Sequence, residues 1–333
     1  MVHDARKPEV AKFANTPFNA VGYRVGAFPL KDGDQAIKEA VELAKQSDTA
    51  IVVAGLNADW ESESYDRPDL SLPMRTNDLI SAVAAANPKT IVVIQAGSAV
   101  SMPWLDQVAG VVFAWYGGNE TGNAIADIVY GKVNPSGRLP ISLPKREQDI
   151  AASTNYKSAR NKIHYEEGIW VGYKHHNERK IAPLFPFGHG LSYTTFEYSD
   201  LKITASPKSD AKADDWSLTA SVKVKNTGKK AGSHSVHFYL TPPAETATSL
   251  RHPEVTLQAF DKVYDLQPGA DKTVEVTLDK CELLSTMIWI SADIRRHFPL
   301  GRAVQDLESR AGRMDRQGRS KRRGDAGRSE VHY

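Results

Sequence analysis

The chain has 333 residues, 41% of them hydrophobic, which gives room for two domains with cores of their own. Its one cysteine, Cys281, excludes an internal disulfide and a cysteine-based zinc site. Of the 42 basic and 40 acidic residues, nine and five lie in residues 301–333, which leaves 33 and 35 in the first 300. The body is therefore slightly acidic and lacks the basic stripe with which proteins bind nucleic acid.

The two ends of the chain show no pattern of regular structure. Residues 1–32 have weak periodicity and are expected to be irregular, and the first eight lack the apolar core of a signal peptide. No apolar run is long enough to cross a membrane, so the chain as written is expected to be cytoplasmic. Residues 291–333 are rich in Arg, Gly and Ser, which predicts a disordered basic tail. An RNA-binding tail is the alternative, but no aromatic residues are interleaved there for base stacking.

Residues 33–145 alternate between helical and strand-like patterns. Apolar residues at helical spacing predict helices over 33–47, 75–87 and 120–130. Apolar runs predict buried strands over 49–56, 90–95 and 110–115. Because strands that alternate with helices at this spacing form a parallel sheet covered on both faces, we expect an α/β sandwich domain.

The pattern changes at the turn Asn134-Pro135-Ser136-Gly137. Residues 146–195 are rich in Pro, Gly, Tyr and His, and we expect an extended segment that wraps over the first domain. From Phe196, apolar and polar residues alternate with period two, which predicts an antiparallel, immunoglobulin-like β-sandwich over 196–290. Five or six strands are visible before Cys281, against about seven in such a sandwich, so we expect it to be incomplete.

The loop from Asp59 to Arg67 carries the strongest functional signal. Asp59, Glu61, Glu63 and Asp66 follow directly on the first predicted strand. Because ligands of open α/β sheets bind beyond the carboxyl ends of the strands, these carboxylates are candidates for acid–base work. The alternative is a solvated polar loop.

Other motifs carry weaker signals. Residues 117–122 lie between a strand and a helix, but their glycine spacing favours a tight turn over a phosphate-binding loop. His175 and His176 stand together with Glu178 nearby, but adjacent side chains do not converge, so a metal pair is not expected. No G-x-S-x-G elbow is present, which leaves an acyl-transfer hydrolase without a nucleophile.

Five stretches in order resemble the carboxyl-terminal half of a glycoside hydrolase family 3 β-glucosidase. The first is the loop Glu61-Ser62-Glu63-Ser64-Tyr65-Asp66-Arg67. The others are residues 114–127, 131–140, 165–173 and 185–193. Each stretch alone is moderately specific, whereas all five in this order are highly specific. The resemblance covers about residues 36–279.

The resemblance implies a (β/α)8 barrel that carries an aspartate nucleophile, then an α/β sandwich and a fibronectin-III-like domain. The last two match the domains predicted above, and the catalytic barrel is absent. Glu63 occupies the position of the general acid/base in the retaining hydrolysis of terminal β-D-glucosyl residues. The substrate would be a β-glucoside or short glucan, and no metal or cofactor is implied. Ser64 stands where the family usually has Gly, and it would strain the loop if that position needs a positive φ.

The resemblance leaves several functions open. The chain is expected to be inactive alone, or to supply Glu63 in trans to a separate catalytic barrel. Alternatives are a carbohydrate-binding or interaction module without catalysis, and an unrelated nucleotide-binding protein, which the glycine spacing disfavours. Glu61 and Asp66 are the next acid/base candidates after Glu63. Neither nucleic acid nor a membrane is expected as a partner, and localisation stays open because such enzymes are often secreted.

Overall fold

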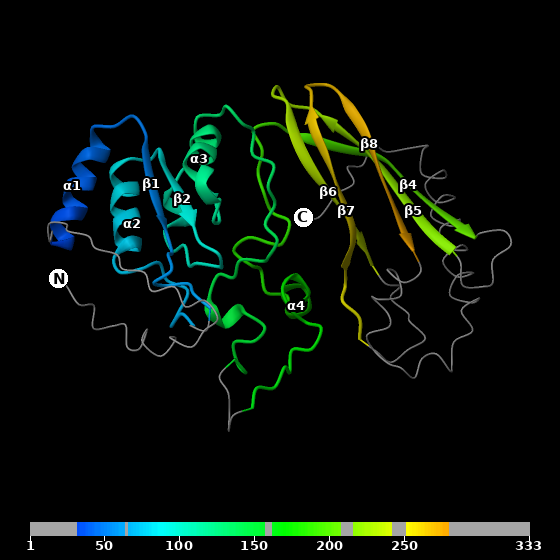
Figure 1. Ribbon diagram of the computed structural model, residues 1–333, viewed down its shortest axis with the longest axis horizontal. Coiled ribbons are helices and arrows are strands. Elements are labelled where there is room, and N and C mark those ends of the chain that lie inside the picture. The colour runs from blue at the N-terminus through cyan, green and yellow to red at the C-terminus, as the bar shows by residue number, and fades with distance from the viewer. Residues whose placement is uncertain (1–31, 64–65, 157–161, 208–215, 242–250, 280–333) are drawn as a thin grey trace, which may run out of the picture.

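The computed structural model describes residues 32–63, 66–156, 162–207, 216–241 and 251–279, which form two units joined by a connecting segment (Figure 1). The first unit contains α1 (Gly33–Lys45), β1 (Ala50–Gly55), α2 (Thr76–Ala86), β2 (Thr90–Gln95), η2 (Leu105–Gln107), β3 (Gly110–Phe113), η3 (Gly118–Glu120) and α3 (Thr121–Val129). The second contains β4 (Phe196–Pro207), β5 (Trp216–Asn226), β6 (Gly232–Leu240), β7 (Thr256–Leu266) and β8 (Asp271–Asp279). This order confirms the predicted fold class, an α/β unit followed by antiparallel β-structure. None of the helices in the described ranges has the length and apolar character needed to cross a membrane.

The parallel sheet has the order β1-β2-β3, with Val52 opposite Val92 and Val92 opposite Val111. The central strand β2 is buried on both faces, since Val92 and Val93 are both 0% exposed. On β1, however, Ile51 is 44% and Val53 is 60% exposed. The prediction that both faces are covered therefore holds for β2 and is wrong for β1. The reason is position: β1 lies at the sheet edge, and α1 packs against α2 instead of over β1.

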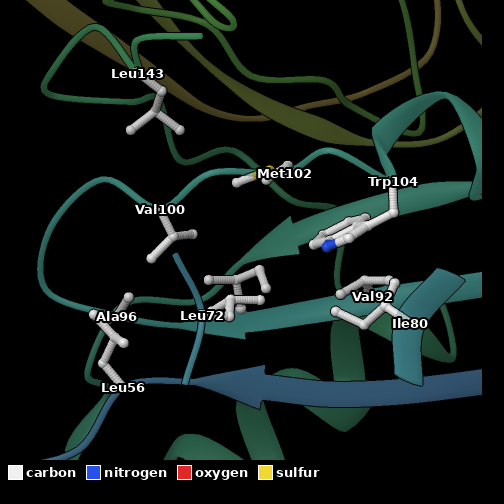
Figure 2. Packing of buried hydrophobic residues seen from close by; sticks show 10 residues of the cluster. Leu56, Leu72, Ile80, Val92, Ala96, Val100, Met102, Trp104 and Leu143 are labelled. Atoms are coloured by element: carbon white, nitrogen blue, oxygen red, sulfur yellow. The ribbon is translucent and has the colours of Figure 1, made fainter. Parts of the chain in front are cut away.

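The core of the first unit is built around Trp104. Figure 2 shows its indole close to Ile80 of α2 and Val92 of β2, with Leu143 farther along the same cluster. The indole N–H donates to Asn77 Oδ1 at 2.9 Å, so the polar group of this buried ring is satisfied. Leu143 is also 0% exposed, although it follows the last helix of the unit by more than ten residues. The core is thus completed by the connecting segment.

The strand β3 ends earlier than the apolar run predicts. It stops at Phe113, and two residues later Trp115 has a φ of 54°, in the left-handed region that residues other than glycine rarely adopt. A tight turn follows, in which Gly118 has a φ of 70° and leads into η3 and α3. A Cβ on Gly117 would lie 2.7 Å from Thr121 Oγ1. The interpretation of residues 117–122 as a tight turn with close helix packing is therefore confirmed.

The connecting segment differs in part from its prediction as an extended chain. It contains the short helices η4 (Glu147–Asp149) and α4 (Tyr173–Arg179). The helix α4 has only seven residues and no apolar stripe, so helical periodicity does not reveal it. Within this segment, Leu184 and Phe185 pack against the core of the first unit, and Phe185 O accepts from Leu143 N–H at 2.8 Å.

The second unit consists of two antiparallel sheets, β4-β5-β8 and β6-β7. Their inner faces share a core that includes Val224, Val236, Val263 and Val274. Asn226, at the end of β5, is 0% exposed, and its side chain makes four hydrogen bonds, described below. The predicted irregular segment before residue 32, Cys281 and the predicted tail lie outside the described residues.

Two of the stretches that carry the family resemblance hold the units together. Residues 131–140 and 185–193 pair with each other, since Leu139 N–H donates to His189 O at 2.9 Å and Gly188 N–H donates to Leu139 O at 2.8 Å. The first stretch then reaches β6, where Arg138 donates to His234 Nδ1 at 2.9 Å. These stretches therefore have a structural part to play, which their sequence alone does not indicate.

Candidate active site

The acidic loop begins at the end of β1, where Gly55 lies very close to Gln95 of the neighbouring strand β2. A Cβ on Gly55 would lie 1.9 Å from the carbonyl oxygen of Gln95, so only glycine fits at this position. Leu56 N–H continues the pairing to Gln95 O at 2.8 Å. The chain then turns, because Asn57 O accepts from the N–H groups of Trp60 and Glu61, both at 2.9 Å. This turn brings the Glu61 side chain over the carboxyl ends of the neighbouring strands.

The Glu61 carboxylate accepts hydrogen bonds from two other loops. Its Oε2 accepts from Gly97 N–H at 2.8 Å and from the Tyr116 hydroxyl at 2.5 Å. Its Oε1 accepts from the Ser98 hydroxyl. Gly97 and Ser98 follow β2, and Tyr116 follows β3. We call these four residues, Glu61, Gly97, Ser98 and Tyr116, the Glu61 clamp.

The clamp has a clear electrostatic consequence. Burial raises the pKa of the Glu61 carboxyl, but the hydrogen bonds from Ser98, Tyr116 and Gly97 and the charge of Arg67 outweigh it and leave the pKa below its usual value. Burial, the hydrogen bond to Glu61 and the charge of that carboxylate raise the pKa of Tyr116 to about 12. Tyr116 as a whole is 52% exposed, but its hydroxyl donates to Glu61. Glu61 is thus held ionised and Tyr116 neutral.

Arg67, at the other end of the acidic loop, binds the same segment that follows β2. Its Nη2 donates to Ser98 Oγ at 3.1 Å and to Ala99 O at 2.6 Å. Ser98 is therefore shared: its hydroxyl donates to Glu61 and accepts from Arg67. Arg67 Nη1 is buried and has no hydrogen-bond partner among the described residues.

Between these two anchors, Glu63 is exposed, as the sequence predicts for a loop beyond β1. No hydrogen bond or ion pair joins it to another residue of the described ranges. Asp66, by contrast, accepts from the Tyr156 hydroxyl at 2.5 Å. Ser64 lies outside the described residues, so the expected strain at that position remains a prediction. The geometry brings Glu61 together with Arg67 and leaves Glu63 outside that network.

Two open hollows lie beside the loop, and Trp60 lines both. One, of about 330 Å³, also contains Gly55, Asn57 and Gln95. The other, of about 190 Å³, contains Arg67, Asp69 and Leu72. Glu63 lines neither of these two hollows.

The two adjacent histidines have structural surroundings. His175 and His176 lie on α4, with ring centroids 5.7 Å apart and their planes at 77°. His176 Nδ1 lies 3.1 Å from Ile181 O, which occupies that nitrogen. Within the described ranges, no three His, Cys, Asp or Glu side chains gather as metal ligands would.

Sequence reasoning did not identify the partners of Glu61. Gly97, Ser98 and Tyr116 lie 36 to 55 positions away from it. A usable signal exists, because all three follow predicted parallel strands at their carboxyl ends, where loops meet. In the sequence, the stretch 114–127 stands out only as part of the family pattern, which assigns no role to Tyr116.

Two family models match the chain. The glycosyl hydrolase family 3 C-terminal domain matches residues 5–193. The fibronectin type III-like domain matches residues 234–287. The first match contains every residue of the Glu61 clamp as well as Glu63, so the candidate site lies wholly within the family 3 domain.

Curated relatives and solved structures agree with these matches. A probable beta-glucosidase I of Emericella nidulans is 43% identical over 272 residues, which are 82% of this chain and 32% of the relative. The crystal structure of a beta-glucosidase from Kluyveromyces marxianus in complex with glucose has a TM-score of 0.69 and 44% identity, and the match covers 75% of this chain and 29% of that one. A beta-glucosidase from Streptomyces venezuelae in complex with D-glucose has a TM-score of 0.68 and 40% identity, over 75% of this chain and 31% of that one.

The chain spans about a third of the length of the curated relatives it matches. Its own α/β unit and the antiparallel sheets that follow correspond to the two family models in the same order. The chain therefore belongs to glycosyl hydrolase family 3, of which it carries the C-terminal domain followed by a fibronectin type III-like domain.

Proposed function

We propose that this chain is the acid/base-bearing part of a retaining β-glucosidase, and that Glu63 is the general acid/base. The observation that carries the proposal is the contrast within one loop. Glu63 is exposed and makes no hydrogen bond or ion pair to another described residue, whereas Glu61 and Asp66 accept hydrogen bonds from Tyr116 and Tyr156. The beta-glucosidase names of the relatives support the reaction class.

The chemistry requires a carboxyl group that gains and loses a proton. In retaining hydrolysis the acid protonates the leaving oxygen, and its conjugate base then activates water against the glycosyl intermediate. Glu61 suits this task poorly, because three donors and the charge of Arg67 favour its ionised form. An exposed carboxyl on the same loop is free to approach a substrate, which favours Glu63.

The nucleophile would come from another part of the enzyme. By family resemblance it would lie on a barrel, with its carboxyl group about 5–5.5 Å from that of the acid/base. General acid catalysis alone contributes about 10²–10⁴-fold, whereas enzymes typically supply at least about 10⁶-fold. We therefore predict no measurable hydrolysis of a chromogenic β-glucoside by residues 1–333 alone.

Glu63→Gln tests the assignment in a chimera that joins this chain to the upstream portion of the Kluyveromyces marxianus beta-glucosidase. We expect turnover to fall by about 10²–10⁴-fold on substrates with poor leaving groups, because these need protonation, and much less on substrates with good ones. Glu42→Gln, which changes an exposed carboxylate on α1, is the control. Turnover that ignores Glu63→Gln on poor leaving groups would remove Glu63 from the mechanism. A chimera that binds glucose without turnover would instead favour a carbohydrate-binding module.

A further inference from the structure

We propose that Glu61 is a positioning residue, which pins the acidic loop to the loops after β2 and β3 and so confines the segment that carries Glu63. The Glu61 clamp itself stands on the described contacts. Its effect on catalysis rests on the proposed function of Glu63.

The acidic loop is bound at both ends to one short segment, residues 97–99. Glu61 accepts from Gly97 and Ser98, and Arg67 donates to Ser98 and Ala99. Ser62 and Glu63 directly follow the anchored Glu61, and the chain spans at most about 3.3–3.6 Å per residue. Glu63 is two residues from Glu61, so its Cα stays within about 7 Å of an anchored one. An exposed side chain is thereby held over a small region.

The backbone next to the clamp is strained at Trp115. Trp115 has a φ of 54°, a conformation that costs a residue other than glycine about 1–3 kcal/mol and persists only where the surroundings impose it. Its ring packs against Phe113 at a centroid distance of 4.6 Å. The next residue is Tyr116, whose hydroxyl reaches Glu61.

The close approach of the clamp residues depends on Gly97. A Cβ on Gly97 would lie 3.0 Å from Tyr116 Cε2 and 3.3 Å from Glu61 Oε2. The absence of a side chain at Gly97 therefore lets both partners close on its N–H. Three donors, Gly97 and Ser98 after β2 and Tyr116 after β3, thus converge on a single carboxylate that the proposed chemistry does not use.

A spectroscopic experiment on the full chain tests the clamp without any activity. The ring signals of ¹³C-labelled tyrosine are followed against pH by NMR, and Tyr116→Phe assigns the residue. We expect Glu61→Gln to lower the pKa of Tyr116 from about 12, because the neighbouring charge disappears, although burial, the largest cause of the raised pKa, remains. The control Glu42→Gln should leave it in place. An unchanged pKa of Tyr116 in Glu61→Gln would overturn the clamp.

The chimera tests the effect on catalysis. We expect Glu61→Gln to lower kcat on poor leaving groups by about 10–100-fold, as a misplaced catalytic group does, with little change in KM. If Glu61 acts through Glu63, adding Glu61→Gln to Glu63→Gln should cause no further loss. An equal loss in both backgrounds would overturn the positioning role, as would no loss from Glu61→Gln alone. If Glu63→Gln itself has no effect, the proposed function fails, while the tyrosine titration still decides on the clamp.

Discussion

At the scale of single residues, surroundings separate side chains of the same type. Glu61 and Glu63 are two positions apart, yet the first accepts three hydrogen bonds and the second is exposed. Asn226 shows the same lesson in the second unit. In the sequence it opens a turn, whereas in the structure its amide donates to Lys230 O and Leu266 O, both at 2.8 Å, and its Oδ1 accepts from Thr194 and Gly228.

Asn226→Asp should therefore be costly. A carboxylate would face two carbonyl oxygens in a position that is 0% exposed, so the free energy of unfolding should fall by about 3 kcal/mol at pH 7. Burial would raise the pKa of the new aspartate, so the folded form would bind the proton more tightly and the loss should shrink as pH falls. Urea unfolding at pH 5 and pH 7 measures both effects. Asn119→Asp, at an exposed position of η3, is the control, and an equal loss there would contradict the explanation.

At the scale of helices and strands, pattern predicts most of the first unit. The predicted strand 90–95 is β2 without change, and the helices over 33–47 and 75–87 differ from α1 and α2 by two residues or fewer at each end. Periodicity works there because burial follows it. It fails at Trp115, whose positive φ is imposed by tertiary packing, and at α4, which is too short to show a period. It also fails for the Glu61 clamp, because pairing between distant loops leaves no local pattern.

Two glycines at strand ends, Gly55 and Gly110, allow a matched test of how closely β1 and β2 pack. A Cβ on Gly55 would lie 1.9 Å from Gln95 O, a backbone atom that cannot move aside, whereas a Cβ on Gly110 meets nothing within 4 Å. We expect Gly55→Ala to lower the free energy of unfolding by about 3 kcal/mol or more, since overpacking forces the backbone apart. Gly110→Ala should be neutral or stabilise by up to about 1 kcal/mol. Equal losses from the two variants, measured by urea unfolding, would contradict the close approach of Gly55 to Gln95.

At the scale of the whole molecule, His234 joins the two units. Arg138 can only donate, so His234 Nδ1 is an acceptor and Nε2 carries the proton that lies toward the Tyr198 hydroxyl. Burial, then the charges of Arg138 and His237, lower the pKa of His234 to about 4. The ring is thus held neutral between an arginine and a tyrosine, with Phe196 stacked at 4.4 Å.

This arrangement predicts an acid-sensitive junction. Between the unfolded pKa of about 6.5 and the folded pKa of about 4, the unfolded chain binds more protons, so stability is complete above pH 6.5 and falls as pH drops toward 4. The contribution of His234 to the slope is at most about 1.4 kcal/mol per pH unit. We expect His234→Gln to flatten the dependence of the urea midpoint on pH in this window. The exposed His164→Gln is the control, and an unchanged slope in His234→Gln would contradict the assignment.

The burial of Leu143 against the first sheet has a consequence for how the chain acquires its structure during synthesis. The core of the α/β unit includes Leu143, with Leu184 and Phe185 packed against it, and the pairing of Leu143 with Phe185 spans 42 positions. A ribosome that has released only the three parallel strands has therefore released an unfinished hydrophobic core. The core can be completed only after residue 185 has left the ribosome. By then the residues of the first unit that contact the second, such as Arg138, have also left it and face solvent. A nascent chain arrested before that residue should expose Trp104 to a fluorescence quencher, and one arrested well after it should protect the ring.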